Sequence, residues 1–561
     1  MAPKKKKKKK GLGGGAFSGG SRSREQSPLR PKFAEKMPPC RNACPSGNRV
    51  REFLTTIAQA ERLKKPTEQA FQEAWEIYTD TSPFPAVCGR VCPHPCEDNC
   101  NRKDLDGAVN VNKIERAIGD FGLEKGLKPK ILSDEKRSEK IAVVGAGPGG
   151  LSCAYQLARR GYAVTVFEAA DKPGGMLRWG IPRYRLPADV LDGEIQKILD
   201  LGVELKCDTP VGQDLSLDDL RGQYQAVFVS IGAHRGLKLR VDGEEAENVF
   251  SGVEFLNRIH HGETIAVGDH VIVVGGGDTA VDAARICRRL GADVTILYRR
   301  TVKEMPAIDE EIEDAQAEGV KLEYLAAPVG FNKEGSRITG MKCIRMELGE
   351  PDDSGRRRPV PIEGSEFEIA ATAVIPAISQ APDFTGYQSL IEDREWIKVD
   401  DSGKSTKVEG VYAGGDAVSL ALVTTAVGQG RRAAETIDRD LRGAEPGRGG
   451  EMPIVKPDRL RLDHYEKVER GEAVTLPVEQ RLAGMETEVN LPLSQAQAIA
   501  ESKRCMSCGF CFDCEKCWLY CQDQAVDKPM EKGVLYSFKM PNCTGCKKCA
   551  EECPCGFIDM L

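Results

Sequence analysis

Residues 141–150 read Ile-Ala-Val-Val-Gly-Ala-Gly-Pro-Gly-Gly, a short apolar run that leads into a G-x-G-x-x-G turn. The pattern predicts a buried strand, a helix over residues 151–160, and a second strand over residues 163–167 that ends at Glu168. Glycines in such a turn let the backbone approach a pyrophosphate at the helix N-terminus, and the acid accepts hydrogen bonds from a ribose. A glycine motif alone is weak evidence. Here all four parts are present, so the stretch predicts a dinucleotide-binding α/β fold.

The same unit occurs a second time further along the chain. An apolar strand over residues 271–274 leads into Gly275-Gly-Gly-Asp-Thr-Ala280, a helix, and a strand over residues 294–298. This second strand ends at Arg299 and Arg300 instead of an acid. Two guanidiniums at that point suit a 2′-phosphate and favour NADPH over NADH; the alternative is that they are ordinary surface arginines. Two such units predict a flavin in the first and a nicotinamide nucleotide in the second.

A third motif, Gly410-Val-Tyr-Ala-Gly-Gly-Asp416, precedes a helix from about Thr424. It resembles the segment with which two-dinucleotide-domain flavoproteins return to the flavin domain and contact the ribityl chain. The flavin domain is therefore expected to be split, with the nicotinamide domain inserted in it. The residues expected at FAD are Gly145, Ala146, Gly147, Gly149, Gly150, Glu168, Gly174, Gly175, Met176, Leu177, Arg185, Val211, Gly415, Asp416, Thr424 and Thr425. Those expected at NAD(P)H are Gly275, Gly276, Gly277, Asp278, Thr279, Ala280, Arg299 and Arg300.

Two cysteine runs near the C-terminus share the spacing C-x2-C-x2-C-x3-C. This is the ligand pattern of a two-cluster bacterial ferredoxin, in which each run donates its fourth cysteine to the other run's cluster. A zinc ribbon needs four cysteines per metal and not these eight, and a disulfide framework suits an exported protein, for which no signal peptide is seen. The runs therefore predict single-electron transfer. Their members are Cys511, Cys514, Cys517 and Cys521, then Cys543, Cys546, Cys549 and Cys553.

Composition limits the remaining possibilities. A chain of 561 residues is long enough for three or four domains with buried cores. The formal charge of −6 argues against nucleic acid as the main partner, and the sequence lacks the apolar stretch that a membrane span requires. Lysines 4–10 and the glycine-rich stretch 11–20 predict a solvated, disordered tail; the alternative is a docking arm for an anion. Many cysteines without an export signal predict a cytoplasmic protein.

With these motifs in place, the chain resembles the glutamate synthase small-subunit family over roughly residues 37–445. The segments that carry the resemblance are Cys44-Pro-Ser-Gly, Cys88-Gly-Arg-Val-Cys92-Pro, Gly175-Met-Leu-Arg-Trp-Gly-Ile-Pro182 and Gly277-Asp-Thr-Ala280. The fused C-terminal cysteine runs mark a subgroup. Their segments Cys514-Glu-Lys-Cys-Trp518 and Cys546-Lys-Lys-Cys-Ala-Glu-Glu-Cys-Pro-Cys-Gly556 look most like the iron–sulfur flavoprotein associated with dissimilatory sulfite reductase (DsrL-type).

The resemblance implies two further 4Fe–4S clusters in an N-terminal helical domain, and here the sequence departs from the family. The family's Arg-Cys-x-x-Cys segment is missing before Cys40, but Arg504-Cys505-Met-Ser-Cys508 supplies one near the other end. One cluster is therefore expected on Cys40, Cys100, Cys505 and Cys508, and the other on Cys44, Cys92, Cys96 and Glu115. The alternative is that Cys505 and Cys508 are bystanders and one cluster is absent.

The predicted fold is α/β, with two Rossmann-like domains between two iron–sulfur domains. The expected order is a disordered tail over residues 1–35, a helical 4Fe–4S domain over 36–138, an FAD domain over 139–265 and 401–445, an NAD(P)H domain over 266–400, a linker over 446–500 and a ferredoxin-like domain over 501–561.

This organisation predicts an NAD(P)H:acceptor oxidoreductase that uses FAD and four 4Fe–4S clusters. The expected partner is a redox protein, either dissimilatory sulfite reductase or a ferredoxin-like acceptor, and a homodimer is compatible with the sequence. The alternatives are a glutamate synthase small subunit and a non-catalytic electron-transfer adaptor.

Overall fold

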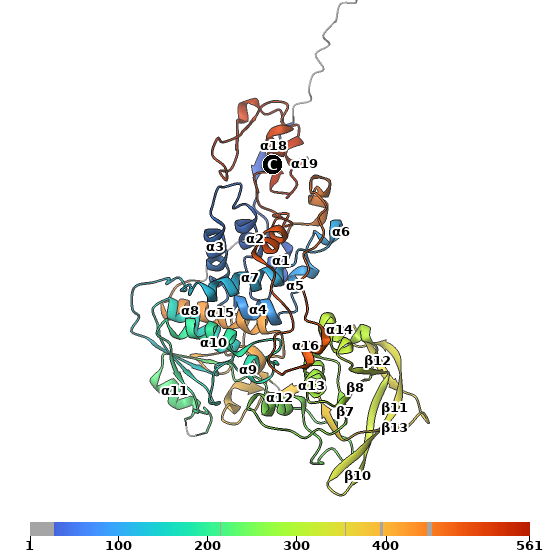
Figure 1. Ribbon diagram of the computed structural model, residues 1–561. Helices are drawn as coiled ribbons and strands as arrows, with labels where there is room; N and C mark the ends of the chain where they lie inside the picture. The colour runs from blue at the N-terminus through green and yellow to red at the C-terminus, as the bar shows by residue number, and fades with distance from the viewer. Residues whose placement is uncertain (1–26, 214, 354, 393–395, 446–451) are drawn as a thin grey trace, which may run out of the picture.

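The computed structural model describes residues 27–213, 215–353, 355–392, 396–445 and 452–561 (Figure 1). The basic run and glycine-rich stretch of the predicted tail lie outside the described residues. The described chain is elongated, with two parallel sheets at one end, a helical domain in the middle and the C-terminal cysteine runs at the other end (Figure 1). None of the helices in these ranges is long and apolar enough to cross a membrane.

The first sheet is parallel and has the strand order β18-β5-β2-β3-β4. β2 is fully buried after its first residue because its apolar run Ile141–Val144 has helices packed over it. α8 and α15 pack so closely that a Cβ at Gly430 would lie 2.1 Å from the Gly149 carbonyl oxygen. The elements are β2 (Lys140–Val144), α8 (Pro148–Arg159), β3 (Ala163–Phe167), α9 (Met176–Trp179), α10 (Ala188–Leu199), β4 (Glu204–Lys206), α11 (Leu217–Gln223), β5 (Ala226–Val229), β18 (Val411–Ala413) and α15 (Val423–Leu441).

The second sheet is also parallel, with the order β14-β7-β8-β9, and is inserted between β5 and β18. Its elements are α12 (Gly252–His260), β7 (His270–Val274), α13 (Asp278–Arg289), β8 (Asp293–Tyr298), α14 (Asp309–Ala317), β9 (Lys321–Tyr324) and β14 (Ala373–Pro376). The chain enters and leaves through paired strands, β6 (Arg235–Gly236) and β15 (Gln380–Ala381). Tyr387, Leu390 and Ile397 pack in the core of the first sheet, so the predicted boundary at residue 400 is too late by about twenty residues. β16 (Ile391–Glu392) and β17 (Trp396–Ile397) pair antiparallel there.

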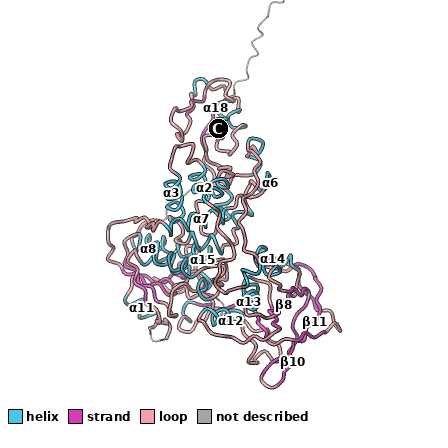
Figure 2. The backbone as a smooth tube through the Cα atoms, in the orientation of Figure 1, coloured by secondary structure: helices cyan, strands magenta, loops and turns pink. Residues whose placement is uncertain are grey.

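An antiparallel arm extends from the second sheet (Figures 1 and 2). It consists of β10 (Ala326–Glu334), β11 (Arg337–Pro351), β12 (Arg357–Pro361) and β13 (Phe367–Ala370). β11 is the central strand and pairs with the other three. Met341 and Cys343 of the arm pack in one core with Ile272 and Leu297 of the second sheet.

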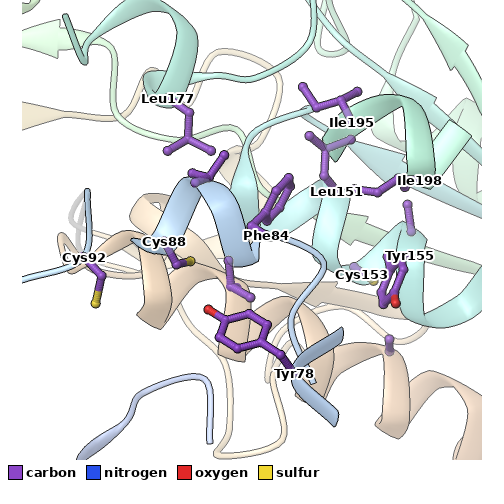
Figure 3. Packing of buried hydrophobic residues seen from close by; sticks show 14 of the residues in the cluster. Tyr78, Phe84, Cys88, Cys92, Leu151, Cys153, Tyr155, Leu177, Ile195 and Ile198 are labelled. Carbon is purple, nitrogen blue, oxygen red and sulfur yellow. The ribbon is translucent and has the colours of Figure 1, made fainter. Parts of the chain in front are cut away.

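The N-terminal domain is helical, as the resemblance implies. α4 and α7 cross at two glycines: a Cβ at Gly89 would lie 2.2 Å from the Arg116 nitrogen, and one at Gly119 would lie 2.2 Å from the Ala86 nitrogen. Figure 3 shows the interface with the helices that cover the first sheet, where Phe84 lies near Leu151 of α8 and Ile195 of α10 in one continuous core. The helices are α1 (Pro39–Ala43), α2 (Val50–Ala58), α3 (Thr67–Thr79), α4 (Pro85–Val91), α5 (Pro95–Asp98), α6 (Lys103–Asp106) and α7 (Val111–Glu124).

The two ends of the described chain meet. β1 (Pro31–Phe33) pairs antiparallel with β21 (Ile558–Met560), so the prediction of disorder up to residue 35 is wrong for this strand. Between these ends lie α16 (Val478–Leu482), α17 (Gln495–Ser502), α18 (Lys516–Leu519), β19 (Val526–Asp527), β20 (Ser537–Phe538) and α19 (Lys548–Glu551).

The predicted linker is packed against the rest of the molecule over residues 452–494. Buried arginines of the helical domain donate to its carbonyls, Arg102 to Glu466 (2.8 Å) and Arg116 to Asn490 (2.6 Å). Further along, Arg481 pairs with Asp314 of the second sheet's domain (2.8 Å). The segment has no long helix or apolar run, which is why its sequence predicts a linker. In the structure, its backbone carbonyls accept hydrogen bonds from buried arginines.

Candidate functional sites

A cavity of about 530 Å³ opens at the C-terminal ends of β2, β3, β5 and β18. Ligands in open parallel sheets bind at this edge because the glycine turn and the helix N-terminus face it. Glu168 is held here by two backbone N–H groups, from Ala146 to Oε2 (2.7 Å) and from Ala170 to Oε1 (2.9 Å). The predicted residues that line the cavity are Gly145, Gly147, Gly149, Glu168, Gly175, Met176, Leu177, Val211, Gly415 and Asp416.

Five other predicted residues do not line this cavity but lie directly behind residues that do. Ala146 anchors Glu168 through its N–H, and Gly174 donates to the Ala146 carbonyl (2.8 Å). A Cβ at Gly150 would lie 1.9 Å from the Gly145 carbonyl oxygen, so its role is helix–strand packing. Thr424 and Thr425 begin α15 next to the lining residue Val423. Sequence reasoning missed His234, Asn257 and His261 in the lining, because no motif marks them.

The prediction that Arg185 contacts FAD is wrong. Its guanidinium is buried between α13 and α14, where it pairs with Asp282 (2.8 Å) and Glu311 (3.0 Å). The two carboxylates are themselves buried, so an arginine is needed to balance their charge. Arg185 therefore joins the segment after α9 to the inserted domain.

A second cavity of about 640 Å³ lies at the C-terminal edge of the second sheet. Gly275, Gly276, Gly277 and Thr279 line it at the start of α13, together with Arg299 and Arg300. Asp278 and Ala280 lie outside the lining: the Asp278 carboxylate accepts from the Ile308 N–H (3.1 Å), and Ala280 is fully buried. Leu420, which follows Asp416, also lines this cavity, so both cavities share the segment before α15.

The two predicted phosphate-binding arginines differ in their surroundings. Arg300 is largely buried, with Nη2 2.8 Å from Asp352 and Nε donating to the Arg357 carbonyl (2.7 Å). Arg299 is exposed on the cavity wall. Arg356, from the turn between β11 and β12, lines the same cavity and was not predicted. The run Arg356–Arg358 is visible in the sequence, but only the pairing of the arm brings it to the cavity.

No three His, Cys, Asp or Glu side chains in the described ranges converge on a single metal ion. The cysteines instead form four looser groups, three of them with four cysteines and one with three cysteines and a glutamate. The first group comprises Cys44, Cys92, Cys96 and Glu115. Burial and then Glu115 raise the pKa of Cys44 to about 11, and the same two causes raise the pKa of Cys92 to about 12. Burial, followed by Glu97, raises the pKa of the Glu115 carboxyl to about 8.

The first group lies next to the first cavity. The Cys92 sulfur is 3.9 Å from the Thr424 hydroxyl, and Thr424 follows the cavity-lining Val423. The N-terminal turn of α15 thus separates the two sites. Cys88, one helical turn before Cys92, is fully buried in the hydrophobic core (Figure 3).

The second group brings together cysteines from both ends of the chain: Cys40, Cys100, Cys505 and Cys508. Burial raises the pKa of Cys40 most, and the charges of Cys505, Cys508 and Cys100 raise it further. Cys505 and Cys508 are partly buried, and desolvation is the first cause that raises their pKa values, to about 12 and about 11.

The C-terminal runs form the third and fourth groups, with their fourth cysteines exchanged. Burial and then Cys553 raise the pKa of Cys514, to about 11. Burial raises the pKa of Cys549 to about 12, followed by Cys543, Cys546 and Cys521. The third group is thus Cys511, Cys514, Cys517 and Cys553, and the fourth is Cys521, Cys543, Cys546 and Cys549.

The two C-terminal runs repeat one backbone conformation. Glu515 and Lys547 each precede a four-residue helix and have left-handed φ angles of 67° and 66°. The repeat matches the internal symmetry of the two cysteine spacings. Sequence reasoning missed Cys555, whose sulfur lies 3.8 Å from that of Cys553.

Two adjoining cavities on dinucleotide-type sheets, with cysteine groups beyond the first, define a class of protein: the flavin- and iron–sulfur-dependent oxidoreductases. Residues 139–430 match the family model of the pyridine nucleotide-disulphide oxidoreductases, and residues 34–127 match dihydropyrimidine dehydrogenase domain II, a 4Fe–4S domain. The chain belongs to the pyridine nucleotide-disulphide oxidoreductase family. It is an FAD- and iron–sulfur-dependent NAD(P)H oxidoreductase.

Three relatives show the range of the family. The NADPH-Fe(3+) oxidoreductase subunit beta of Geobacter sulfurreducens is 37% identical over 514 residues, covering 84% of this chain and 75% of the relative. The NADP(+)-dependent formate dehydrogenase subunit beta of Moorella thermoacetica is 41% identical over 432 residues, covering 72% and 60%. The glutamate synthase [NADPH] small chain of Escherichia coli is 35% identical over 432 residues, covering 71% and 88%. The resemblance to glutamate synthase small subunits is thereby confirmed.

Proposed function

We propose that the chain is an NADPH:acceptor oxidoreductase that supplies a redox partner protein with single electrons, through four 4Fe–4S clusters. The observation that carries the proposal is the sequence of neighbouring sites, from the second cavity to the first and from there to the four cysteine groups. FAD would accept a hydride from the nucleotide and release its two electrons one at a time to the clusters.

The second cavity has the features that NADPH requires. The N-terminus of α13 and its glycine turn offer backbone N–H groups and a positive dipole to a pyrophosphate. Arg299 and Arg356 reach the cavity from β8 and from the arm, where they can bind a 2′-phosphate. Arg300 holds the arm over the cavity through its ion pair with Asp352.

The first cavity suits FAD. The N-terminal turn of α8 faces the pyrophosphate position, and the backbone-anchored Glu168 presents its carboxylate to a ribose. Gly415 has a φ of 70° and brings Asp416 to the cavity wall, where its carboxylate can accept a hydrogen bond from the ribityl chain.

The fourth cysteine group provides the exit for electrons. Cys546 is the exposed member of this group, which lies at the end of the molecule away from the cavities. The partner that we propose is dissimilatory sulfite reductase, because the C-terminal runs resemble those of the flavoprotein associated with that enzyme. The second candidate is a glutamate synthase small subunit, which the 88% coverage of the Escherichia coli small chain favours.

Steady-state oxidation of NADPH with a viologen dye tests the activity. We expect turnover that is faster with NADPH than with NADH; no turnover with either nucleotide would leave only an electron-transfer adaptor. The purified protein should then be offered dissimilatory sulfite reductase or the glutamate synthase large subunit under anaerobic conditions. NADPH oxidation dependent on the first protein supports the sulfite reductase assignment, and dependence on the second overturns it.

A further inference from the structure

The segment around Cys505 and Cys508 is built into the N-terminal domain. It follows α17, which packs on α2 and α7. On one side of it, the Arg102 guanidinium donates to the Arg504 carbonyl (2.6 Å). On the other side, the Lys36 N–H donates to the Gly509 carbonyl (3.1 Å). The two cysteines therefore sit on a stretch of backbone that is held at both ends by residues more than 400 positions away.

A buried charge network fixes this position. The side chain of Arg504 is 1% exposed and pairs with Glu501 (2.6 Å) and Asp106 (2.9 Å). It also donates to the Gly107 and Ala108 carbonyls, at 2.8 and 3.0 Å. Its Nε donates to the Val468 carbonyl (3.1 Å), so every nitrogen of the guanidinium has an acceptor, which is the condition under which a buried arginine is tolerated. The loop after α6 and the loop after α17 are thereby locked together.

Cys508 accepts one hydrogen bond at its sulfur and another at its backbone carbonyl. The Asn101 side-chain amide lies 3.6 Å from the Cys508 sulfur, and Arg51 donates to the Cys508 carbonyl (3.1 Å). Donors beside a thiolate stabilise its negative charge and tune a cluster's reduction potential. The donor set of the second group is thiols alone, which suits a 4Fe–4S cluster.

We propose that Cys505 and Cys508 complete, with Cys40 and Cys100, a 4Fe–4S site built from both ends of the chain, and that this site connects the flavoprotein to the C-terminal runs. Each thiol loses its proton as the thiolate binds iron. The second group lies between the first and the third because it is linked to each of them by a short stretch of chain. Cys40 and Cys44 lie at the two ends of the five-residue helix α1, and Cys508 and Cys511 are three residues apart.

Tyr465 supports this placement independently. Its ring stacks on Phe512 with centroids 5.8 Å apart, and its hydroxyl donates to the Met506 carbonyl (2.8 Å). The ring also packs in the same small apolar cluster as Met506 and Cys508. The ring thus lies between the second and third groups. The site does not depend on the partner or the direction of electron flow proposed above.

The test uses the full chain, purified anaerobically. The double variant Cys505→Ala/Cys508→Ala should hold about twelve iron atoms where the parent holds about sixteen, and one reduced-cluster EPR signal should disappear. Cys100→Ala, at the other end of the chain, should remove the same signal. Cys343→Ala removes a buried cysteine in the arm and serves as the matched control, with full iron expected. A double variant that keeps all its iron, or that loses a different signal from Cys100→Ala, overturns the proposal.

A gentler variant covers the case in which the alanine proteins do not fold. Cys508→Ser keeps an oxygen ligand, so the iron content should stay near that of the parent. The EPR line shape and the reduction potential of one cluster should change while the other three stay as they were. A spectrum and potentials identical to those of the parent show that Cys508 does not bind iron, and the proposal is then wrong.

Discussion

Replacing Arg299 by alanine should lower kcat/KM for NADPH far more than kcat/KM for NADH. Arg299 is exposed on the wall of the second cavity, so its guanidinium is available to a 2′-phosphate. A hydrogen bond to a charged group contributes about 1.5–3 kcal/mol. At roughly 1.4 kcal/mol per factor of ten, kcat/KM for NADPH should fall about 10- to 150-fold, while kcat/KM for NADH changes less than about 2-fold.

Arg300→Ala should behave differently, although the two arginines are adjacent. Arg300 already pairs with Asp352 and donates to the Arg357 carbonyl, so it holds the arm in place. Its loss should move Arg356 as well and lower kcat/KM for both nucleotides, with a fall in melting temperature. Arg299→Ala should leave the melting temperature unchanged.

Initial rates of nucleotide oxidation with a viologen dye give kcat/KM for both nucleotides in each variant. Arg337→Ala, at an exposed position that begins β11, is the matched control. Equal losses for NADPH and NADH in Arg299→Ala would refute the 2′-phosphate site. A selective loss in Arg300→Ala alone would refute the division of roles between the two arginines.

Three further predictions concern the framework. Arg185→Met should destabilise the protein by about 3–5 kcal/mol in urea unfolding, because Asp282 and Glu311 lose a buried partner, while FAD content stays the same; loss of FAD without loss of stability would restore a flavin role. Gly430→Val should cost at least about 1–3 kcal/mol and reduce bound flavin, since its side chain meets α8; an unchanged melting temperature would contradict this. Burial raises the pKa of Glu194, which accepts from the Ala86 and Val87 N–H groups, to about 8. Because the folded pKa is raised, the contribution of Glu194 to the free energy of unfolding is full below the unfolded pKa near 4.5 and is lost as pH rises through about 8. In urea unfolding, Glu194→Gln should therefore gain stability relative to the parent between pH 5 and 9. A difference in stability that stays constant over this range would count against the prediction.

The local elements were predictable where one pattern determines them. The strand over 163–167 and the helix after the first glycine turn appear as expected, because apolar periodicity and glycine spacing act over a few residues. Arg185 was misplaced because its partners come from α13 and α14, about a hundred residues later. Arg356 was missed for the same kind of reason: only strand pairing in the arm brings it to the second cavity. The packing of segment 452–494 could not be foreseen from its own apolar pattern. Its backbone carbonyls accept hydrogen bonds from arginines that are more than 350 residues away in the sequence.

The pairing of β1 with β21 has a consequence for biosynthesis. The two strands are separated by roughly 525 residues, so at 5–20 residues per second a ribosome needs roughly 25–100 s to produce the second after the first. During that interval both nucleotide-binding sheets can fold, while the N-terminal strand has no partner. The first and last strands of the described residues can therefore pair only after the intervening domains have been translated. A cofactor whose ligands come from both of these ends can therefore be completed only after the last ligand is synthesised, when the flavin site can already have formed.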